Sequence, residues 1–258
     1  KPWKADLFRI DLGSNQVHRL PRLFEGAKET VRWSPDGKWI ALLERGVMNL
    51  RQTAIGNTAA MKTGIENKSP YRSQPKWSPD SRRFVVCSAP PTPKRRVAMI
   101  ESTPNGQIQP KLKELDYVKP GDPLPKPFPV LFELTENGYD WQVVKPEMFP
   151  EPFTLTDHFD MTWAPDGSEF YFDYNQRGHQ LYRVLAVNAE TSAARVVVEE
   201  RSETFIHYSG KSWRHWLHAT HELIWMSERD GWCHLWLYDV KTGKPKHPIT
   251  KGLWPVRE

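Results

Sequence analysis

The phrase that decides the fold occurs three times, as Trp33-Ser34-Pro35-Asp36-Gly37, Trp77-Ser78-Pro79-Asp80-Ser81 and Trp163-Ala164-Pro165-Asp166-Gly167. The copies are 44 and 86 residues apart, so a unit of about 43 residues, with one copy lacking the phrase, fits both intervals. Proline presets φ and Asp-Gly favours a tight turn. Each phrase therefore predicts a turn between two strands, with the tryptophan at the end of the first strand.

The residues after each phrase predict a second strand. The stretches Lys38–Leu43, Arg83–Cys87 and Glu169–Phe172 are nearly continuous in apolar and aromatic residues, which is typical of strands buried on both faces. Further apolar strands and short polar turns follow. Four antiparallel strands in about 43 residues predict a β-propeller blade. Helical repeats of this length would need a 3.6-residue periodicity, which these segments lack.

Composition supports an all-β fold. The 258 residues include 12 Trp, 8 Tyr, 11 Phe and 23 Pro, and proline breaks helices whereas aromatic residues suit pleated sheets. Hydrophobic residues at 38% and charged residues at 26% indicate a folded globular chain. No run approaches ~18 apolar residues, so we expect no membrane segment. The start, Lys1-Pro2-Trp3-Lys4, has no signal-peptide core, which leaves the periplasm, the exterior and the cytoplasm all open.

Charge and cysteines point to no special partner or cross-link. The net charge is +5, and basic clusters such as Lys94-Arg95-Arg96 are not interleaved with aromatic residues as a nucleic-acid groove requires, so we expect no nucleic-acid partner. Cys87 and Cys233 lie in strand-like runs far apart in the sequence. We interpret them as two buried free thiols rather than a disulfide.

The repeat gives parts of about six units, and five to six blades are expected over residues 1–258. Both ends of the chain cut through the pattern. Either the terminal strands close one blade, or the chain is part of a larger propeller, and open propeller edges would then allow a homodimer. The expected outer strands start near Leu7, Val47, Val97, Val130, Leu181 and His234.

Several segments go beyond a generic propeller. They include Lys119-Pro120-Gly121-Asp122 within Leu115–Pro127, the strand pair Ser227–Tyr238 with its continuation Ile249–Val256, and Asp173–Arg177. Together they resemble the N-terminal propeller of dipeptidyl peptidase IV-type serine peptidases, within the prolyl oligopeptidase family. The resemblance covers the chain from about residue 30 onward.

This resemblance implies an eight-bladed propeller that caps a C-terminal α/β-hydrolase domain with a Ser-Asp-His triad, restricts access and positions peptide substrates. The hydrolase domain is absent from this chain. The segment of this chain most similar to a Gly-x-Ser-x-Gly nucleophile elbow lacks the second glycine; it is Gly210-Lys211-Ser212-Trp213-Arg214. We therefore predict a partial propeller that is not catalytic alone and uses no cofactor, with the hydrolase domain and peptides as partners.

The resemblance also implies a Glu-Glu pair, before one copy of the phrase, that binds the amino end of the substrate. Here the stretch before Trp77 has only Glu66 as an acidic residue, so Glu66 is the candidate amine ligand, with an ordinary loop carboxylate as the alternative. Asn175, Gln176 and Arg177 form a polar turn after an apolar strand. They are candidates for substrate contact or for hydrogen bonds between blades.

Two further clusters could carry chemistry. His215, His218 and His221, with His207 nearby, have metal-ligand side chains, but their place at strand ends favours no metal site. Another cluster is acidic: Glu199, Glu200 and Glu203. Two of its carboxylates could act together in general acid–base catalysis, but the favoured interpretation is that all three are solvated side chains at the edge of a blade.

Two other classes compete with the peptidase hypothesis. A free-standing TolB-like or WD40-like propeller would act as a protein-interaction scaffold. A propeller enzyme acting on glycans would need two converging acids in its central channel.

Overall fold

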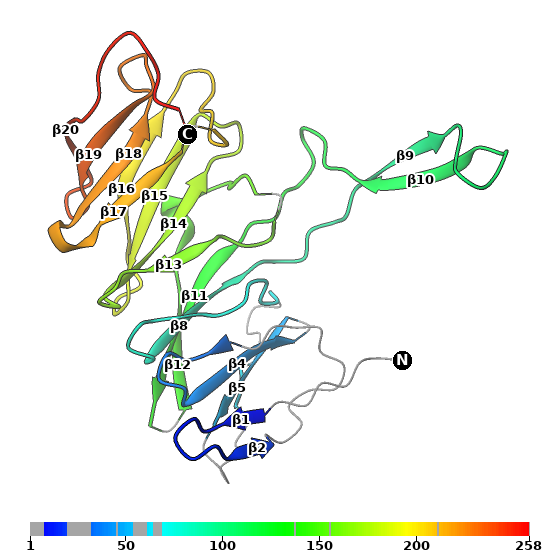
Figure 1. Ribbon diagram of the computed structural model, residues 1–258. Coiled ribbons are helices and arrows are strands. Elements are labelled where there is room, and N and C mark those ends of the chain that lie inside the picture. The colour runs from blue at the N-terminus through cyan, green and yellow to red at the C-terminus, as the bar shows by residue number, and fades with distance from the viewer. Residues whose placement is uncertain are drawn as a thin grey trace.

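The structure, a computed structural model, describes residues 8–19, 32–44, 46–53, 61–63, 69–136, 138–154, 156–210 and 212–257. It is all-β, with four four-stranded sheets and two two-stranded pairs, all antiparallel (Figure 1). Two 3₁₀ turns, η1 (Pro146–Met148) and η2 (His218–Thr220), are the helical elements of these residues. Within the described ranges, no helix has the length and apolar character needed to cross a membrane.

The four larger sheets are consecutive blades of a β-propeller, numbered in chain order. Blade 1 contains β3 (Arg32–Trp33), β4 (Trp39–Glu44), β5 (Val47–Gln52) and β6 (Met61–Thr63). Blade 2 contains β7 (Lys76–Trp77), β8 (Arg83–Ser88), β11 (Phe128–Thr135) and β12 (Gly138–Val143). Blade 3 contains β13 (Met161–Trp163), β14 (Glu169–Asn175), β15 (Leu181–Asn188) and β16 (Ala194–Arg201). Blade 4 contains β17 (Arg214–Leu217), β18 (Glu222–Ser227), β19 (His234–Asp239) and β20 (Lys244–Pro248).

The blades pack face to face through three apolar cores, one at each junction. The middle strands supply side chains to two cores at once, because successive residues of a strand point to opposite faces. In β8, Val85 and Cys87 face blade 3, whereas Phe84 and Val86 face blade 1. The prediction of strands buried on both faces is confirmed, and this double burial explains the continuous apolar runs.

Each Trp-Ser-Pro-Asp phrase forms a turn held by its own side chains. The Ser34 hydroxyl donates to Asp36 at 2.6 Å and accepts from the Trp39 amide at 3.0 Å, and Ser78 makes the same two contacts in blade 2. The fifth position requires a left-handed backbone, and Gly37 adopts φ 71° there. The tryptophans end β3, β7 and β13, as predicted.

The same phrase also joins neighbouring blades. The Trp163 indole donates to the Lys76 carbonyl at 2.8 Å, and the Trp77 indole donates to the Arg32 carbonyl at 3.3 Å. The Ser81 hydroxyl accepts from the Asp36 amide at 2.9 Å. The first strands of blades 2 and 3 are therefore each fixed to the first strand of the blade before them, which gives the recurring tryptophan a structural role.

The 86-residue interval between Trp77 and Trp163 has a different cause from the one predicted. It holds one sheet, because β8 pairs directly with β11, and the added length is a hairpin of β9 (Arg96–Glu101) and β10 (Lys111–Asp116) inserted between them. This β9–β10 arm projects away from the blades (Figure 1). Val130 lies in the third strand of blade 2, as predicted for an outer strand, whereas Val97 lies in the arm and does not mark a separate blade.

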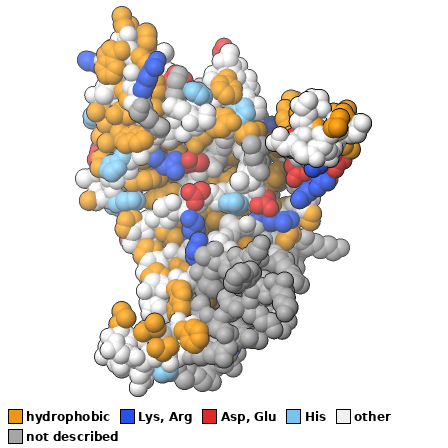
Figure 2. Space-filling view, turned by 45° about the vertical axis from the view of Figure 1, so that its right-hand side comes forward, with side chains coloured by type: hydrophobic (Ala, Val, Ile, Leu, Met, Phe, Trp, Pro, Cys, Tyr) orange, Lys and Arg blue, Asp and Glu red, His pale blue; other side chains and the backbone are white. Residues whose placement is uncertain are grey.

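The arm has apolar side chains at its surface, at the right of Figure 2. Ile100 is 72% exposed and Leu112 is 65% exposed.

A second two-stranded pair, β1 (Phe8–Ile10) with β2 (Val17–Arg19), precedes blade 1. The number of blades in a complete propeller stays a prediction.

Blade 4, whose outer strand was predicted to start near His234, contains a divergent copy of the Trp phrase that sequence reasoning missed. Trp216 has the register of the phrase's tryptophan, and His221 is the left-handed residue of the turn, with φ 54°. The signal was hidden because Leu217-His218-Ala219-Thr220 replaces Ser-Pro-Asp. The equivalent cross-strand pairs are Trp33 with Ile40, Trp77 with Phe84, Trp163 with Phe170 and Trp216 with Leu223.

Candidate functional site

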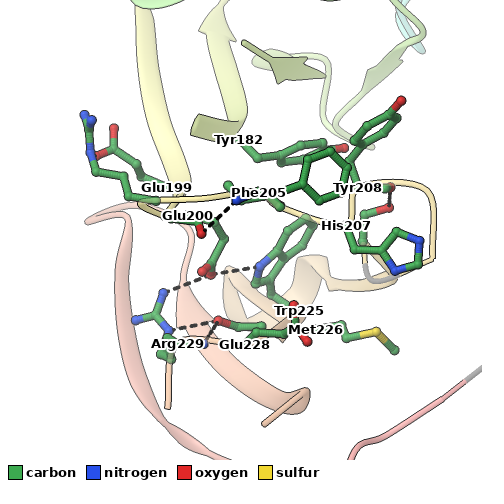
Figure 3. Close-up of a pocket in the computed structure, with 15 residues that line it drawn as sticks. Tyr182, Glu199, Glu200, Phe205, His207, Tyr208, Trp225, Met226, Glu228 and Arg229 are labelled. Atoms are coloured by element: carbon green, nitrogen blue, oxygen red, sulfur yellow. Dashed lines mark hydrogen bonds and ion pairs between the residues drawn. The ribbon is translucent and has the colours of Figure 1, made fainter. Parts of the chain in front are cut away.

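A cavity of about 320 Å³ lies where blades 3 and 4 meet, at the end of the blades opposite the Trp-Ser-Pro-Asp turns (Figure 3). We call it the blade 3–4 pocket. Three chain segments (199–202, 205–208 and 225–229) and two single residues, Tyr182 of β15 and Ser212, form its walls. Its lining residues are Tyr182, Glu199, Glu200, Arg201, Ser202, Phe205, Ile206, His207, Tyr208, Ser212, Trp225, Met226, Ser227, Glu228 and Arg229.

Glu200 is the anionic centre of this pocket. Its Oε1 atom accepts from the Trp225 indole at 3.1 Å, from Arg229 Nη2 at 3.0 Å and from the Tyr238 hydroxyl at 3.3 Å. The Glu200 side chain is 13% exposed. Burial, and then the Glu200 charge, raise the pKa of Tyr238, so its hydroxyl stays a donor at neutral pH.

Arg229 is held rigidly beside Glu200. Its Nε donates to the Ser227 hydroxyl at 3.1 Å, and its Nη2 also donates to Tyr238. The guanidinium lies over the rings of Trp236 and Tyr238, 5.0 and 5.2 Å from their centroids. Such cation–π contacts add to the ion pair and leave Arg229 little rotational freedom.

The neighbouring carboxylate, Glu199, pairs with arginines on the other side of the strand. Arg183 donates to it at 2.7 Å and Arg201 at 2.6 Å. Burial raises the pKa of Glu199, but the hydrogen bonds from both arginines outweigh it and hold that pKa below its usual value. The favoured interpretation of Glu199 and Glu200 as a solvated edge is wrong, because both are ion-paired, whereas Glu203 is exposed.

A second, half-buried ion pair lies behind Tyr182 of the pocket lining. Arg214 donates to both oxygens of Asp173 at 2.6 Å, and the Tyr182 hydroxyl donates to Asp173 at 2.8 Å. Burial and the Asp173 charge raise the pKa of Tyr182. Because Tyr182 lines the pocket and Arg214 comes from blade 4, this triad fixes the two blades in one arrangement.

An aromatic cluster forms the outer rim. His179, with a left-handed backbone at φ 60°, stacks on Tyr208 with centroids 4.7 Å apart and contacts Phe153 and Phe205 edge-on. Phe205 is 52% exposed. Burial lowers the pKa of His179. The rings tie the β14–β15 turn to the connection between blades 3 and 4.

The predicted residues Asn175, Gln176 and Arg177 lie on this β14–β15 turn and outside the pocket lining. Arg177 Nη1 donates to the Asp122 carbonyl at 2.7 Å, and Asn175 Oδ1 lies 3.2 Å from His179 Nδ1. These are contacts within the propeller. A role in substrate contact stays a prediction. Glu66 lies outside the described residues.

The histidine series does not converge on a metal site. Among the described residues, no group of three or more His, Cys, Asp or Glu side chains is arranged to hold a metal ion. His215 is on β17, His218 is the first residue of the η2 turn and His221 follows that turn. Ser212, the serine of the incomplete nucleophile elbow, donates to the Tyr208 carbonyl at 2.7 Å.

Two of the segments that carried the resemblance, Ser227–Tyr238 and Ile249–Val256, contact each other through His234. His234 is buried, and its ring nitrogens lie 3.1 Å from the Thr250 hydroxyl and 3.0 Å from the Gly252 carbonyl oxygen. Its ring meets Trp254 edge-on at 5.2 Å. The histidine of β19 thus anchors the segment that leaves blade 4. Cys87 and Cys233 are both buried and form no disulfide, as predicted.

Comparisons with known proteins identify the kind of domain. A sequence model of the family described as the dipeptidyl peptidase IV (DPP IV) N-terminal region matches residues 71–258. The crystal structure of Porphyromonas gingivalis dipeptidyl peptidase 4 is similar with a TM-score of 0.67 and 16% identity, over 97% of this chain and 36% of that chain. A putative dipeptidyl aminopeptidase IV from Bacteroides ovatus ATCC 8483 has a TM-score of 0.57 and 17% identity, over 97% of this chain and 39% of that chain. At these identities the likeness shows a shared fold, and this chain spans little more than a third of those solved chains.

Proposed function

Because this chain belongs to the family of dipeptidyl peptidase IV N-terminal regions, we propose that it is the propeller of a dipeptidyl peptidase IV-like serine peptidase and is not catalytic alone. In this proposal it restricts access and positions peptides for a C-terminal α/β-hydrolase domain. The observation that carries the proposal is the family match over residues 71–258. It favours this role over a free-standing TolB-like scaffold.

The chemistry of the described residues supports a non-catalytic role. A serine nucleophile needs a base within hydrogen-bond reach and an acid to orient that base. Ser212 donates to a backbone carbonyl instead, and the carboxylates Glu199 and Glu200 are held by arginines and ring donors. Both carboxylates are committed to structure, which also argues against a glycan-cleaving enzyme that uses them.

The position of the pocket supports a role in holding peptides. It combines aromatic rings with fixed polar groups in a cavity, which is the usual composition of a binding site. It lies at the end of the blades that also carries the β14–β15 turn with Asn175, Gln176 and Arg177. We propose that this end faces the hydrolase domain, and that open edges of the isolated chain could pair two copies.

An activity comparison tests this proposal. The isolated 258-residue chain and the complete gene product are each incubated with an X-Pro-p-nitroanilide substrate and with a fluorophosphonate probe that labels active serines. We expect no turnover and no labelling of the isolated chain, and both with the complete product. Turnover by the isolated chain, or a complete product without a reactive serine, would overturn the proposal.

Access control has its own test. In a complete product, deleting blade 3 removes part of the propeller wall and should allow cleavage of folded proteins or long polypeptides that the intact protein excludes. An unchanged size limit for substrates would contradict the gating role while leaving the peptidase assignment intact.

A further inference from the structure

We propose that the β9–β10 arm joins two copies of this chain into a dimer, in which β9 of one copy pairs antiparallel with β9 of the other. The surface involved is the outer edge of β9, which is distinct from the open edges of the blades. The proposal rests on the strand order, exposure and charges of the arm, and it is independent of the proposed function.

The arm is a two-stranded sheet that has two outer edges. Among the described residues, β9 and β10 pair with each other and with no other strand, and the arm extends away from the blades (Figure 1). Val97 is partly buried, and the other residues of both strands are exposed. A two-stranded hairpin alone is marginally stable in water, and its outer N–H and C=O groups can pair with a further strand. An added strand at one edge would therefore stabilise the arm.

The charges of β10 oppose pairing of this strand with a second copy of itself. A two-fold axis between two antiparallel copies of a strand places one residue opposite its own copy, and the residues on either side then pair symmetrically. Centring β10 on Lys113 or on Glu114 places two equal charges opposite each other. Centring it on Leu112 or on Leu115 makes the two flanking residues of like charge pair with each other. Like charges directly opposite are destabilising, so the edge of β10 does not favour a second copy.

The outer edge of β9 complements itself. A register centred on Ala98 places Val97 opposite Met99 of the second copy. The same register places Arg95, just before β9, opposite Glu101 at its end. Because the axis repeats each contact, two ion pairs flank an apolar centre. Apolar pairs and opposite charges directly across two strands are the pairs that stabilise a sheet.

Registers centred on the neighbouring residues lose this match. Centring β9 on Val97 would place Arg95 opposite Met99, and centring it on Met99 would place Glu101 opposite Val97. The charges of the strand therefore select the register centred on Ala98.

Both members of the intermolecular ion pair are accessible. The Arg95 side chain is 54% exposed, and its Nε lies 3.6 Å from Asp122 Oδ1, which is too far for a hydrogen bond. Within the described part of the chain, Glu101 has no ion-pair partner. A second copy can therefore approach Arg95 and Glu101 without breaking a close ion pair of the arm.

Pairing also joins apolar side chains that each arm exposes to water. Cross-strand partners share one face of a sheet, so Val97 and Leu115 lie on the same face, and Met99 joins them two residues along β9. Met99 is 51% exposed and Leu115 is 40% exposed. In the dimer these side chains meet those of the second copy across the β9–β9 pair, which removes apolar surface from water.

A lysine at the two-fold axis tests the proposal on the 258-residue chain, with the dissociation constant of the dimer measured by sedimentation equilibrium. Ala98→Lys places two lysines opposite each other in the dimer, but within its own arm the new lysine faces Glu114, which supports the hairpin. We expect the dissociation constant to rise at least tenfold. The matched control, Ile108→Lys, adds the same charge in the turn between β9 and β10, where Ile108 is 96% exposed, and should have an effect below twofold. The blade edges are the same in all these proteins.

Charge reversal provides a rescue experiment. Arg95→Glu and Glu101→Arg should each weaken the dimer about tenfold, because each replaces two ion pairs by two pairs of like charges. The double variant restores opposite charges, so its dissociation constant should return to within about threefold of the wild-type value. High salt should weaken the wild-type dimer, since these charges are exposed to solvent.

A disulfide tests the register directly. In the dimer, Ala98→Cys brings two Cα atoms to about 4.5–5.5 Å from each other, which suits a disulfide, so mild oxidation should give a covalent dimer. Ile100→Cys lies on the same strand, but its two copies would be about 14 Å apart, so it should cross-link far less. Cys87 and Cys233 are buried and should not contribute.

Three outcomes would overturn the proposal: a wild-type chain that stays monomeric at submillimolar concentration, a dimer that Ala98→Lys leaves intact, or equal cross-linking of Ala98→Cys and Ile100→Cys. A dimer that survives Ala98→Lys would lie at the blade edges instead. Each outcome leaves the proposed function standing, because that is tested by the peptidase activity of the complete product.

Discussion

The side chain of Arg177 donates a 2.7 Å hydrogen bond to the backbone carbonyl of Asp122, 55 residues earlier in the chain. Asp122 belongs to the Lys119-Pro120-Gly121-Asp122 segment, whose turn is closed by the Asp122 carboxylate accepting from the Lys119 amide at 2.9 Å. Arg177 belongs to the β14–β15 turn. Two segments that carried the family resemblance separately therefore meet, and their contact joins the connection after the arm to blade 3.

Replacing Arg177 with alanine should destabilise this junction. The Asp122 carbonyl would lose its charged donor in a half-buried place, so we expect a loss of about 1 kcal/mol in the free energy of unfolding. Urea unfolding of Arg177→Ala measures it. The control is Arg82→Ala, whose side chain is 67% exposed, with an expected change under about 0.5 kcal/mol. Equal effects of the two variants would contradict a specific role for the Asp122 contact.

The indole N–H of Trp163 should stabilise the packing of blade 3 against blade 2 through its one hydrogen bond. Trp163→Phe keeps a ring in the core but removes the 2.8 Å bond to the Lys76 carbonyl. We expect a loss of about 1–2 kcal/mol, partly from the unsatisfied carbonyl and partly from lost packing. Trp232→Phe, in an exposed turn, is the control. A Trp163 variant as stable as wild type would show that the phrase acts only within its own turn.

The repeat phrase predicted most of the fold because its turn chemistry is local. Ser34 and Asp36 close their own turn, so the signal needs no information from distant residues. The β9–β10 arm could not be told from a blade, because its alternating strands resemble outer blade strands in sequence. The copy at Trp216 escaped detection because Leu217-His218-Ala219-Thr220 replaces the serine, proline and aspartate, and His221 replaces the glycine.

The site was predictable only in part. The polar turn at Asn175–Arg177 was found because it interrupts an apolar pattern. Glu200 was misjudged because its partners, Trp225, Arg229 and Tyr238, come from the next blade, and the sequence alone gives no sign that they converge. Sites between blades depend on tertiary packing, whereas turns depend on neighbours along the chain.

The Cys87 thiol should be unreactive in the folded protein. It is fully buried, its sulfur accepts from the Phe159 amide at 3.2 Å, and burial raises its pKa to about 12. Because the thiolate is the nucleophile, labelling at pH 8 should be negligible. Titration with a disulfide reagent should detect no fast thiol in native protein and two in urea, since Cys233 is also buried. Rapid native labelling of Cys87 would contradict its burial.

Stability should fall between neutral pH and pH 5.5 through His179. Burial lowers the pKa of its imidazole in the folded state, so the unfolded chain binds the proton more readily. The stability that neutral His179 contributes is fully present above the ordinary histidine pKa of about 6.5. It is lost as the pH falls from there through the lowered pKa of His179 in the folded state. Urea midpoints at pH 7.5 and 5.5 measure it. His179→Asn suits the left-handed backbone and should show a smaller pH difference, and an unchanged difference would refute the assignment.

The β9–β10 arm should be dispensable for folding of blade 2. β8 pairs with β11 along six residue pairs from Arg83 with Glu133 to Ser88 with Phe128, and the arm leaves that ladder intact. Its ion pairs, between Arg96 and both Glu114 and Asp116, are internal to the arm. Replacing Arg96–Asp116 with a short Gly-Ser linker keeps the Lys119–Asp122 turn, and it should therefore shift the Tm by no more than about 2 °C and leave the far-UV spectrum of the blades unchanged. The linker also removes the exposed Ile100 and Leu112, so solubility should rise.

Extending the deletion to Asp122 removes the carbonyl that Arg177 binds, and this longer variant should lose about 1 kcal/mol more than the first. Cooperative unfolding at a much lower temperature in the first variant would mean that the arm stabilises the blades directly.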